Sequence, residues 1–121
     1  MPLNKQPILI VDQDAHFCDE LYNFLLSAGY ENVDFARNLA EALEKIEESE
    51  YYVVVLDAGS HFEAGVRSAD SIIGLRPKTK VVLMVGPERR PEPKPKAREG
   101  LQFLIKAMFT RNLLYLLEKE S

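Results

Sequence analysis

The sequence predicts an α/β fold in which helices cover a parallel β-sheet. Short apolar runs alternate along the chain with amphipathic segments of helical period, which is the pattern of repeated βα units. Two of the apolar runs, residues 8–11 and 52–56, are rich in β-branched residues and are followed at once by Asp12 and Asp57. Strands that are apolar throughout are typical of parallel sheets buried on both faces. Both acids are therefore expected at the carboxyl edge of one sheet.

The first half of the chain predicts three strands, at residues 7–12, 33–36 and 51–56. The helix after the first strand is expected to begin after Asp14, its N-cap, and to end before Gly29. Its buried stripe has helical spacing and consists of Phe17, Leu21, Phe24, Leu25 and Ala28.

A second helix is expected after the second strand, with Asn38 as its N-cap. Its inward residues share one face of the helix: Leu39, Leu43 and Ile46. Glu41 and Lys45 lie one turn apart on this helix, which is the spacing of a helical ion pair.

After Asp57 the sequence predicts a loop from Gly59 to Gly65 and then a helix that ends before Pro77. The inward face of that helix contains Val66, Ala69, Ile72 and Ile73. Two further strands are expected at residues 80–85 and 101–105.

The last predicted helix has more apolar surface than one buried face needs. Its inward residues are Phe109, Leu113, Leu116 and Leu117. Leu114 and Tyr115 widen this surface, which leaves a homodimer through the last helix open.

Residues 86–98 interrupt the alternation at the place where a fourth helix is expected. The segment holds Pro87, Pro91, Pro93 and Pro95, with charged residues between them. Each proline ring removes an amide donor and clashes with the preceding turn, so an extended or polyproline-like loop is predicted, with at most one helical turn near residues 97–99. The segment is either a solvated loop or a changed partner interface, such as a dock for a module that recognises proline-rich chain.

Composition and charge exclude several classes of function. The 121 residues are enough for one domain, and no apolar run approaches the roughly 20 residues of a membrane span. Residues 1–7 lack the apolar stretch of a secretory signal, so a cytoplasmic location is expected. Cys18 is the single cysteine, which excludes an intrachain disulfide. The net charge of -4 opposes direct binding to nucleic acid or to a membrane.

The order and spacing of four residues resemble the receiver domain of two-component response regulators. Asp12 follows the first strand, Asp57 the third and Lys106 the fifth, while Gly65 lies eight residues after Asp57. The resemblance covers residues 7–119 and makes the whole chain a single receiver domain. It implies a flavodoxin-like parallel sheet of order 2-1-3-4-5 with helices on both faces, and with the fourth helix short or replaced by the proline-rich loop.

The resemblance also implies the roles of individual residues. Receivers accept a phosphoryl group on an aspartate beside a bound Mg²⁺, and Asp57 matches that acceptor. Asp12, Asp57 and the Gly59 backbone carbonyl match the metal ligands, and Lys106 matches the cation that holds the phosphoryl oxygens. The donor would be a histidine kinase or a phosphotransfer protein, and protein partners would dock on the face formed by residues 86–119. An acceptor domain rather than an enzyme is expected.

Several positions depart from the family pattern. Gln13 stands where a second acid usually ligates the metal, and its uncharged amide predicts weaker Mg²⁺ binding, while Asp14 is expected to be committed as an N-cap. Val85 replaces the Thr or Ser that binds the phosphoryl group and draws in the aromatic ring on the fifth strand, a position held here by Phe103. Ala107 stands where a cis proline usually follows the lysine.

These residues support two main hypotheses and one remote one. The first is an atypical receiver that accepts phosphate on Asp57 with weakened metal binding and switching. The second is a pseudo-receiver, an interaction module that signals without phosphate. The remote hypothesis is a phosphatase of the haloacid-dehalogenase type, which Asp12-Gln13-Asp14 resembles and in which Asp12 would be the nucleophile. His16 does not match the residue that such phosphatases have there.

Overall fold

The computed structural model describes residues 5–59, 61–86 and 100–118. Strands and helices follow one another in the predicted order: β1 (Ile8–Val11), α1 (Ala15–Ser27), β2 (Val33–Ala36), α2 (Leu39–Glu48), β3 (Val53–Asp57), α3 (Phe62–Leu75), β4 (Lys80–Val85), β5 (Leu101–Ile105), the 3₁₀ turn η3 (Lys106–Met108) and α4 (Phe109–Glu118). The predicted proline-rich loop at residues 86–98 lies, apart from Gly86, outside the described residues. Within the described ranges, no helix has the length and apolar character needed to cross a membrane.

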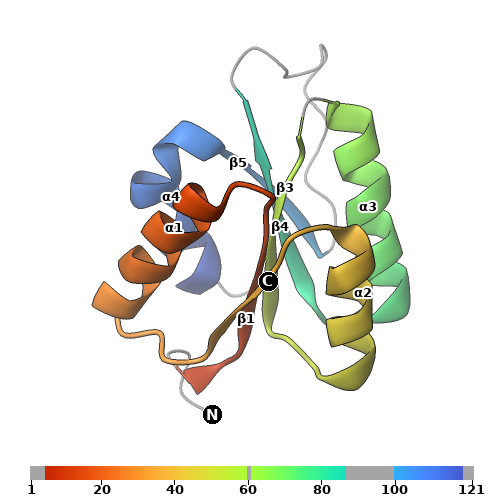
Figure 1. Cartoon of the computed structure of the whole chain (residues 1–121), viewed down its shortest axis with the longest axis horizontal. Helices are drawn as coiled ribbons and strands as arrows, with labels where there is room; N and C mark the ends of the chain where they lie inside the picture. Colours follow the sequence, from red (N-terminus) through yellow and green to blue (C-terminus); the bar gives the residue numbers. More distant parts are fainter. Residues whose placement is uncertain (1–4, 60, 87–99, 119–121) are drawn as a thin grey trace.

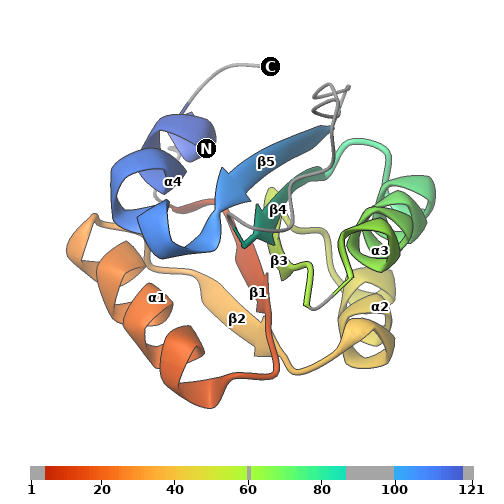
Figure 2. The same ribbon diagram turned by 90° about the horizontal axis from the view of Figure 1, so that it is seen from above.

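The five strands form one parallel sheet in the order β2-β1-β3-β4-β5, which confirms the predicted topology. Helices α1 and α4 cover one face of the sheet, and α2 and α3 cover the other (Figures 1 and 2). Because all strands run in the same direction, the residues that follow β1, β3 and β5 meet at one edge of the sheet.

Alternate strand residues pack into two apolar clusters, one on each face of the sheet. Ile8 and Ile10 of β1 pack with α1 and α4, whereas Leu9 and Val11 pack with α2 and α3. The helix residues at the centre of these clusters have no exposed surface: Leu21, Leu25, Leu113 and Leu117 on one face, and Ala42, Ile46, Ala69 and Ile72 on the other. Burial of one Leu or Ile side chain stabilises a fold by about 1.5–3 kcal/mol, so both faces hold the sheet rigidly.

The predicted helix caps are present. Asp14 Oδ1 accepts hydrogen bonds from the amides of His16 and Phe17, and Asn38 Oδ1 accepts one from the amide of Glu41. The strand predicted at residues 7–12 is shorter in the structure, where it covers Ile8–Val11. The strand predicted at residues 51–56 is shifted along the chain and covers Val53–Asp57.

The expected ion pair between Glu41 and Lys45 of α2 is not formed. Lys45 Nζ lies 3.2 Å from Asp34 Oδ2 of β2, while Glu41 faces Arg37. Asp34 also accepts a hydrogen bond from the Tyr51 hydroxyl at 2.9 Å. Lys45 thus links α2 to the edge strand β2 and does not pair with a residue of α2.

The loop predicted from Gly59 to Gly65 is too long, because α3 already begins at Phe62. Gly65 therefore lies inside the helix, where a Cβ would come within 2.8 Å of Ala58 Cβ and 2.9 Å of Ala58 Cα. Only a glycine allows α3 to pack this closely on the chain that follows Asp57. This close approach gives a physical reason for a glycine eight residues after the acid.

Of the two residues that widen the apolar surface of α4, Leu114 packs on the domain's own core and Tyr115 does not; Leu116 packs inward as predicted. Leu114 and Leu116 are partly buried and pack against the cluster of α1 and α4. Tyr115 is 62% exposed, and its exposed neighbours on α4 are polar: Thr110, Arg111, Asn112 and Glu118.

Candidate functional site

Asp12, Asp57 and Lys106 come together at the carboxyl edge of the sheet. Asp12 directly follows β1, Asp57 ends β3 and Lys106 directly follows β5. The Lys106 Nζ atom lies 2.8 Å from Asp12 Oδ2 and 3.3 Å from Asp57 Oδ1. One ammonium group is therefore shared by two carboxylates that arrive on different strands.

Asp12 is the buried member of the pair of acids. Its side chain is 2% exposed, and the only partner that the described residues offer Oδ2 is the Lys106 ammonium. Its other carboxylate oxygen accepts a hydrogen bond from the Asp14 amide at 3.0 Å. Its backbone carbonyl accepts a weak bond from the Cys18 thiol, with an S–O distance of 3.6 Å. A charge this deeply buried depends on its partners, so Asp12 and Lys106 hold each other in place.

Asp57 is more accessible, with a side chain that is 25% exposed. Burial raises the pKa of Asp57 and the nearby charge of Asp12 raises it further, while Lys106 and the Gly59 amide act in the opposite direction, with a net rise in pKa. Two carboxylates close together disfavour each other's ionised form unless a cation lies between them. Lys106 is that cation.

Burial alone would lower the pKa of Lys106. The hydrogen bond to Asp12 and the charges of Asp57 and Asp12 outweigh burial, so the pKa of the ammonium rises and it stays charged. Lys106 Nζ also lies 4.4 Å from the centroid of the Phe17 ring. Lys106 begins η3, so the chain turns into α4 although Ala107 stands at the position after the lysine.

The oxygen atoms near Asp57 are of the kind that Mg²⁺ prefers. Asp12 and Asp57 supply carboxylates, and Gly59 adopts a φ of 71°, a backbone conformation that glycine adopts without strain. The exposed Gln13 lines the same cavity. Within the described residues, no group of three or more His, Cys, Asp or Glu side chains is arranged to hold a metal ion. The donor types fit Mg²⁺, but only two carboxylates are present.

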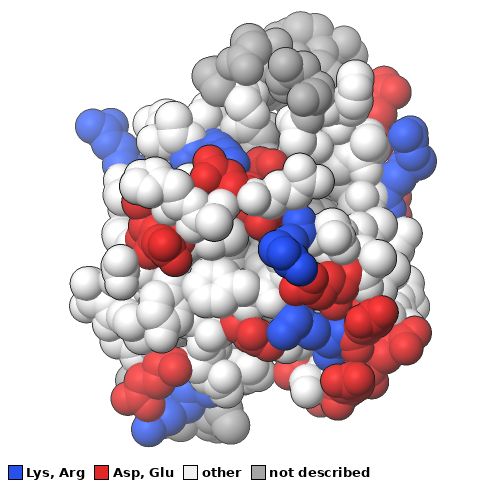
Figure 3. Space-filling view, in the orientation of Figure 1, with Lys and Arg blue, Asp and Glu red and all other residues white. Residues whose placement is uncertain are grey.

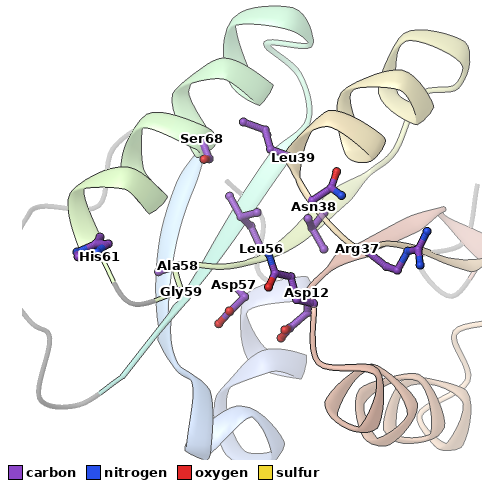
Figure 4. A pocket seen from close by; sticks show the side chains of 12 residues that line it. Asp12, Arg37, Asn38, Leu39, Leu56, Asp57, Ala58, Gly59, His61 and Ser68 are labelled. Carbon is purple, nitrogen blue, oxygen red and sulfur yellow. The ribbon is translucent and has the colours of Figure 1, made fainter.

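The acids line one end of a cavity of about 450 Å³. Its wall continues toward α2 and α3 through Arg37, Asn38 and Ser68 (Figure 4). Asp14 is not among the residues that line this cavity, and its carboxylate caps α1. His61 lines the cavity from the N-cap position of α3, and its ring points away from Asp57 (Figure 4).

The two expected switch positions are filled by apolar contacts. Val85 at the end of β4 is buried, with 6% of its surface exposed, and offers no hydroxyl. The ring of Phe103 on β5 stacks on Phe62 at the start of α3, with centroids 5.7 Å apart and planes inclined by 28°. The Phe103 ring is thus held by another aromatic ring.

Phe17 and Phe62 are site neighbours that the sequence does not single out. Phe17 fits the buried stripe of α1, and Phe62 falls in the segment predicted as a loop. Each contact joins residues more than 40 positions apart, and no local pattern reports such a pairing. For Phe17 the sequence offers one signal, its place three residues after Asp14, the predicted N-cap near the acidic edge, whereas for Phe62 it offers none.

Known proteins match this chain both in sequence and in fold. A family model described as response regulator receiver domain matches residues 8–117. The structure resembles chemotaxis protein CheY4 of Vibrio cholerae at 22% identity and a TM-score of 0.73, with 94% of this chain and 97% of that chain covered. Comparison with curated protein sequences finds no match.

Two further solved structures show the same similarity. A CheY-like response regulator receiver domain protein of Methanospirillum hungatei has 24% identity and a TM-score of 0.74, covering 94% of this chain and 91% of that one. The signal receiver domain of an HD domain-containing protein from Pseudomonas fluorescens has 26% identity and a TM-score of 0.73, covering 93% and 85%. Since the family model spans nearly the whole chain, the chain belongs to the response regulator receiver domain family.

Proposed function

We propose that the domain accepts a phosphoryl group on Asp57, donated by a histidine kinase or a phosphotransfer protein. The observation that supports this most is the meeting of Asp57, Asp12 and Lys106, with the ammonium 3.3 Å and 2.8 Å from the two acids. Asp57 is the acceptor because its side chain is 25% exposed, whereas that of Asp12 is 2% exposed.

In the proposed step, a carboxylate oxygen of Asp57 attacks the phosphorus of a phosphohistidine on the donor. The phosphorus–nitrogen bond breaks as the new phosphorus–oxygen bond forms, and the histidine nitrogen leaves with the electron pair. Lys106 already lies beside the attacking carboxylate, where it offsets the negative charge on the phosphoryl oxygens. The partly exposed cavity gives the donor access to this side of Asp57.

We also propose weak Mg²⁺ binding by oxygens of Asp12, Asp57 and Gly59, with Gln13 as an uncharged additional ligand. When bound, the ion offsets the repulsion between carboxylate and phosphoryl group. Gln13→Asp is expected to lower the Mg²⁺ concentration for half-maximal phosphorylation at least tenfold, because a unit negative charge about 4 Å from a divalent ion contributes about 2 kcal/mol even in water. Gln13→Ala is the control, and equal Mg²⁺ requirements for both variants would contradict a ligand role at this position.

The acceptor role is tested by the intact mass of the protein after incubation with acetyl phosphate and Mg²⁺. We expect the added mass of one phosphoryl group on the natural sequence and none on Asp57→Asn. An unmodified protein, under conditions in which a receiver with two acids after its first strand is modified, would refute the proposal.

The second candidate function is a pseudo-receiver that binds its partner without phosphate. The contact of Phe103 with Phe62 favours it, because the ring has an aromatic neighbour in place and Val85 has no hydroxyl to draw it elsewhere. The affinity for a partner is measured for the natural sequence and for Asp57→Asn, each with and without phosphodonor. If all four affinities are equal, the domain is a pseudo-receiver and not a phosphoryl acceptor. A difference that depends on Asp57 and on phosphodonor excludes the pseudo-receiver.

The phosphatase alternative has little support from the site. Asp12 would have to act as the nucleophile, yet its side chain is buried against Lys106. Asp14 would have to act as the general acid or base, yet Oδ1 accepts hydrogen bonds from the amides of His16 and Phe17. We therefore regard the domain as a phosphoryl acceptor and not as a hydrolase.

Partners are proposed to dock on the face formed by residues 86–119, of which β5, η3 and α4 are described. The exposed surface of α4 is polar around Tyr115, which suits a transient contact better than a permanent one. A homodimer through α4 loses support, because Leu114 and Leu116 face the domain's own core. Sedimentation at increasing concentration is expected to give the mass of one chain, and a rising mass would restore the dimer.

A further inference from the structure

We propose that Phe17 is a positioning residue that holds the Lys106 ammonium against Asp12 and Asp57. Lys106 Nζ lies 4.4 Å from the centroid of the Phe17 ring, within the range of a cation–π contact. The same atom lies 2.8 Å from Asp12 Oδ2 and 3.3 Å from Asp57 Oδ1. The ring and the two acids therefore enclose the ammonium from different elements of the fold.

The lysine benefits from such support because its long side chain has many rotamers. A lysine side chain gains up to about 2 kcal/mol of rotamer entropy when it is free to move. Ala107, the next residue, lacks the ring with which a proline would fix the backbone. Since the side chain of Lys106 is 27% exposed, water competes for its ammonium wherever the protein does not cover it.

The Phe17 ring is itself held from two sides. Its amide donates to Oδ1 of Asp14, the N-cap of α1, at 3.2 Å. Its ring packs edge-to-face on Phe109, with centroids 5.3 Å apart and an interplanar angle of 75°. Phe109 begins α4, directly after the turn that Lys106 starts. Phe17 thus contacts both ends of the turn from Lys106 to Phe109 and fixes it relative to α1.

The ring also changes the electrostatics of the site. Its face carries partial negative charge and attracts the ammonium without offering a proton acceptor, so the hydrogen bonds of Lys106 remain directed at the acids. It also excludes water from one side of the ammonium, which strengthens the attraction between Lys106 and both carboxylates. If Asp57 accepts a phosphoryl group as proposed above, Phe17 speeds that step by keeping Lys106 in place.

Phe24 provides a matched control on the same helix. It makes an equivalent edge-to-face contact with Phe109, with centroids 5.2 Å apart and an interplanar angle of 86°. It lies seven residues beyond Phe17, which is roughly 10 Å farther along the helix axis. Phe17→Leu and Phe24→Leu remove the same atoms and the same kind of packing, but only the first removes a ring from Lys106.

The first measurement is the proton NMR spectrum of the Lys106 side chain in the unphosphorylated protein. The ring current of Phe17 is expected to shift its terminal methylene signals upfield in the natural sequence and in Phe24→Leu and Phe17→Tyr. The shift is expected to disappear in Phe17→Leu, and in Phe17→Met if the leucine variant does not fold. Unchanged Lys106 signals in both Phe17 variants would overturn the proposal.

The second measurement is the rate of phosphoryl uptake from acetyl phosphate. Phe17→Leu is expected to lower the rate roughly threefold, in the range of an exposed or partly buried cation–π contact, with Phe24→Leu close to the natural rate and Phe17→Tyr restoring it. Equal losses in both leucine variants would overturn the positioning role and leave only packing. If the natural sequence takes up no phosphoryl group, the proposed function fails, and the NMR result alone decides whether Phe17 positions Lys106.

Discussion

At the scale of single residues, the chemistry of the site depends on one cation shared by two carboxylates. Lys106 neutralises the buried Asp12 and at the same time faces the accessible Asp57. The pKa of Asp57 is nevertheless raised, because burial and Asp12 outweigh Lys106 and the Gly59 amide. Lys106 thus gives the buried Asp12 carboxylate a partner while Asp57 stays accessible to solvent.

Replacement of this cation is expected to affect stability as well as chemistry. Lys106→Met leaves the buried Asp12 carboxylate without its partner, which we expect to lower the free energy of unfolding by about 2 kcal/mol at neutral pH. Lys45→Met removes a more exposed ion pair to Asp34 and is expected to cost less than about 1 kcal/mol. Urea denaturation of both variants measures the difference. Equal losses would show that Asp12 does not depend on Lys106.

At the scale of elements, close packing of α3 on Ala58 fixes the chain directly after Asp57. Gly65 permits an approach that a methyl group would block, because Ala58 Cβ lies 2.8 Å from the position of an added Cβ. Phe62 at the start of the same helix contacts Phe103 of β5. The start of α3 is thereby tied both to Ala58, directly after Asp57, and to β5, the strand that precedes Lys106.

Two glycines of α3 give opposite predictions for the same substitution. Gly65→Ala is expected to lower the free energy of unfolding by about 2 kcal/mol, since the helix has to move away from Ala58. Gly74→Ala meets nothing within 4 Å and is expected to leave stability unchanged or to raise it by up to about 1 kcal/mol. Thermal unfolding of the two variants compares them. If Gly65→Ala is as stable as Gly74→Ala, the approach of α3 to Ala58 does not require a glycine at position 65.

The edge strand β2 is fastened through Asp34. Burial acts to raise the pKa of Asp34, but the Phe35 amide, the Tyr51 hydroxyl and Lys45 outweigh burial and lower it. Because the side chain is 46% exposed, Asp34→Asn is expected to cost only about 1 kcal/mol at neutral pH. A lowered pKa means that this contribution is complete above about pH 4 and is lost as the pH falls through the pKa of the folded state.

Unfolding of the natural sequence and of Asp34→Asn should therefore be compared across the acid range. The difference in free energy is expected to be constant at neutral pH and to shrink toward zero in strong acid. A difference that persists unchanged in acid would assign the effect to the shape of the side chain and not to its charge.

The order of apolar runs and helix caps is enough to predict the sheet topology and the edge at which the site lies. Asp12, Asp57 and Lys106 each follow a strand directly, so a parallel sheet brings them to one edge regardless of detail. α3 begins earlier than the sequence predicts, because its N-cap is His61, whose side chain makes no capping hydrogen bond. The predicted pair of Lys45 with Glu41 is wrong, because the partner of Lys45 is Asp34, which lies on a strand and not on the same helix.

At the scale of the whole molecule, charge is distributed unevenly over the surface. Exposed acidic side chains gather over α2 and the turn that follows it, as Figure 3 shows, and these include Glu44, Glu47, Glu48 and Glu50. Such a surface repels nucleic acid and agrees with the net charge of -4. We therefore predict that the domain does not bind DNA directly, and we expect its partners to be proteins.

Whether Asp57 accepts the phosphoryl group is tested most directly by locating that group on the chain. After incubation with acetyl phosphate and Mg²⁺, reduction by borohydride converts an aspartyl phosphate to a stable alcohol that peptide mass spectrometry can locate. We expect one modified residue, Asp57, and no modification of Asp12. Modification at Asp12 or His61, or at no residue at all, would contradict this expectation.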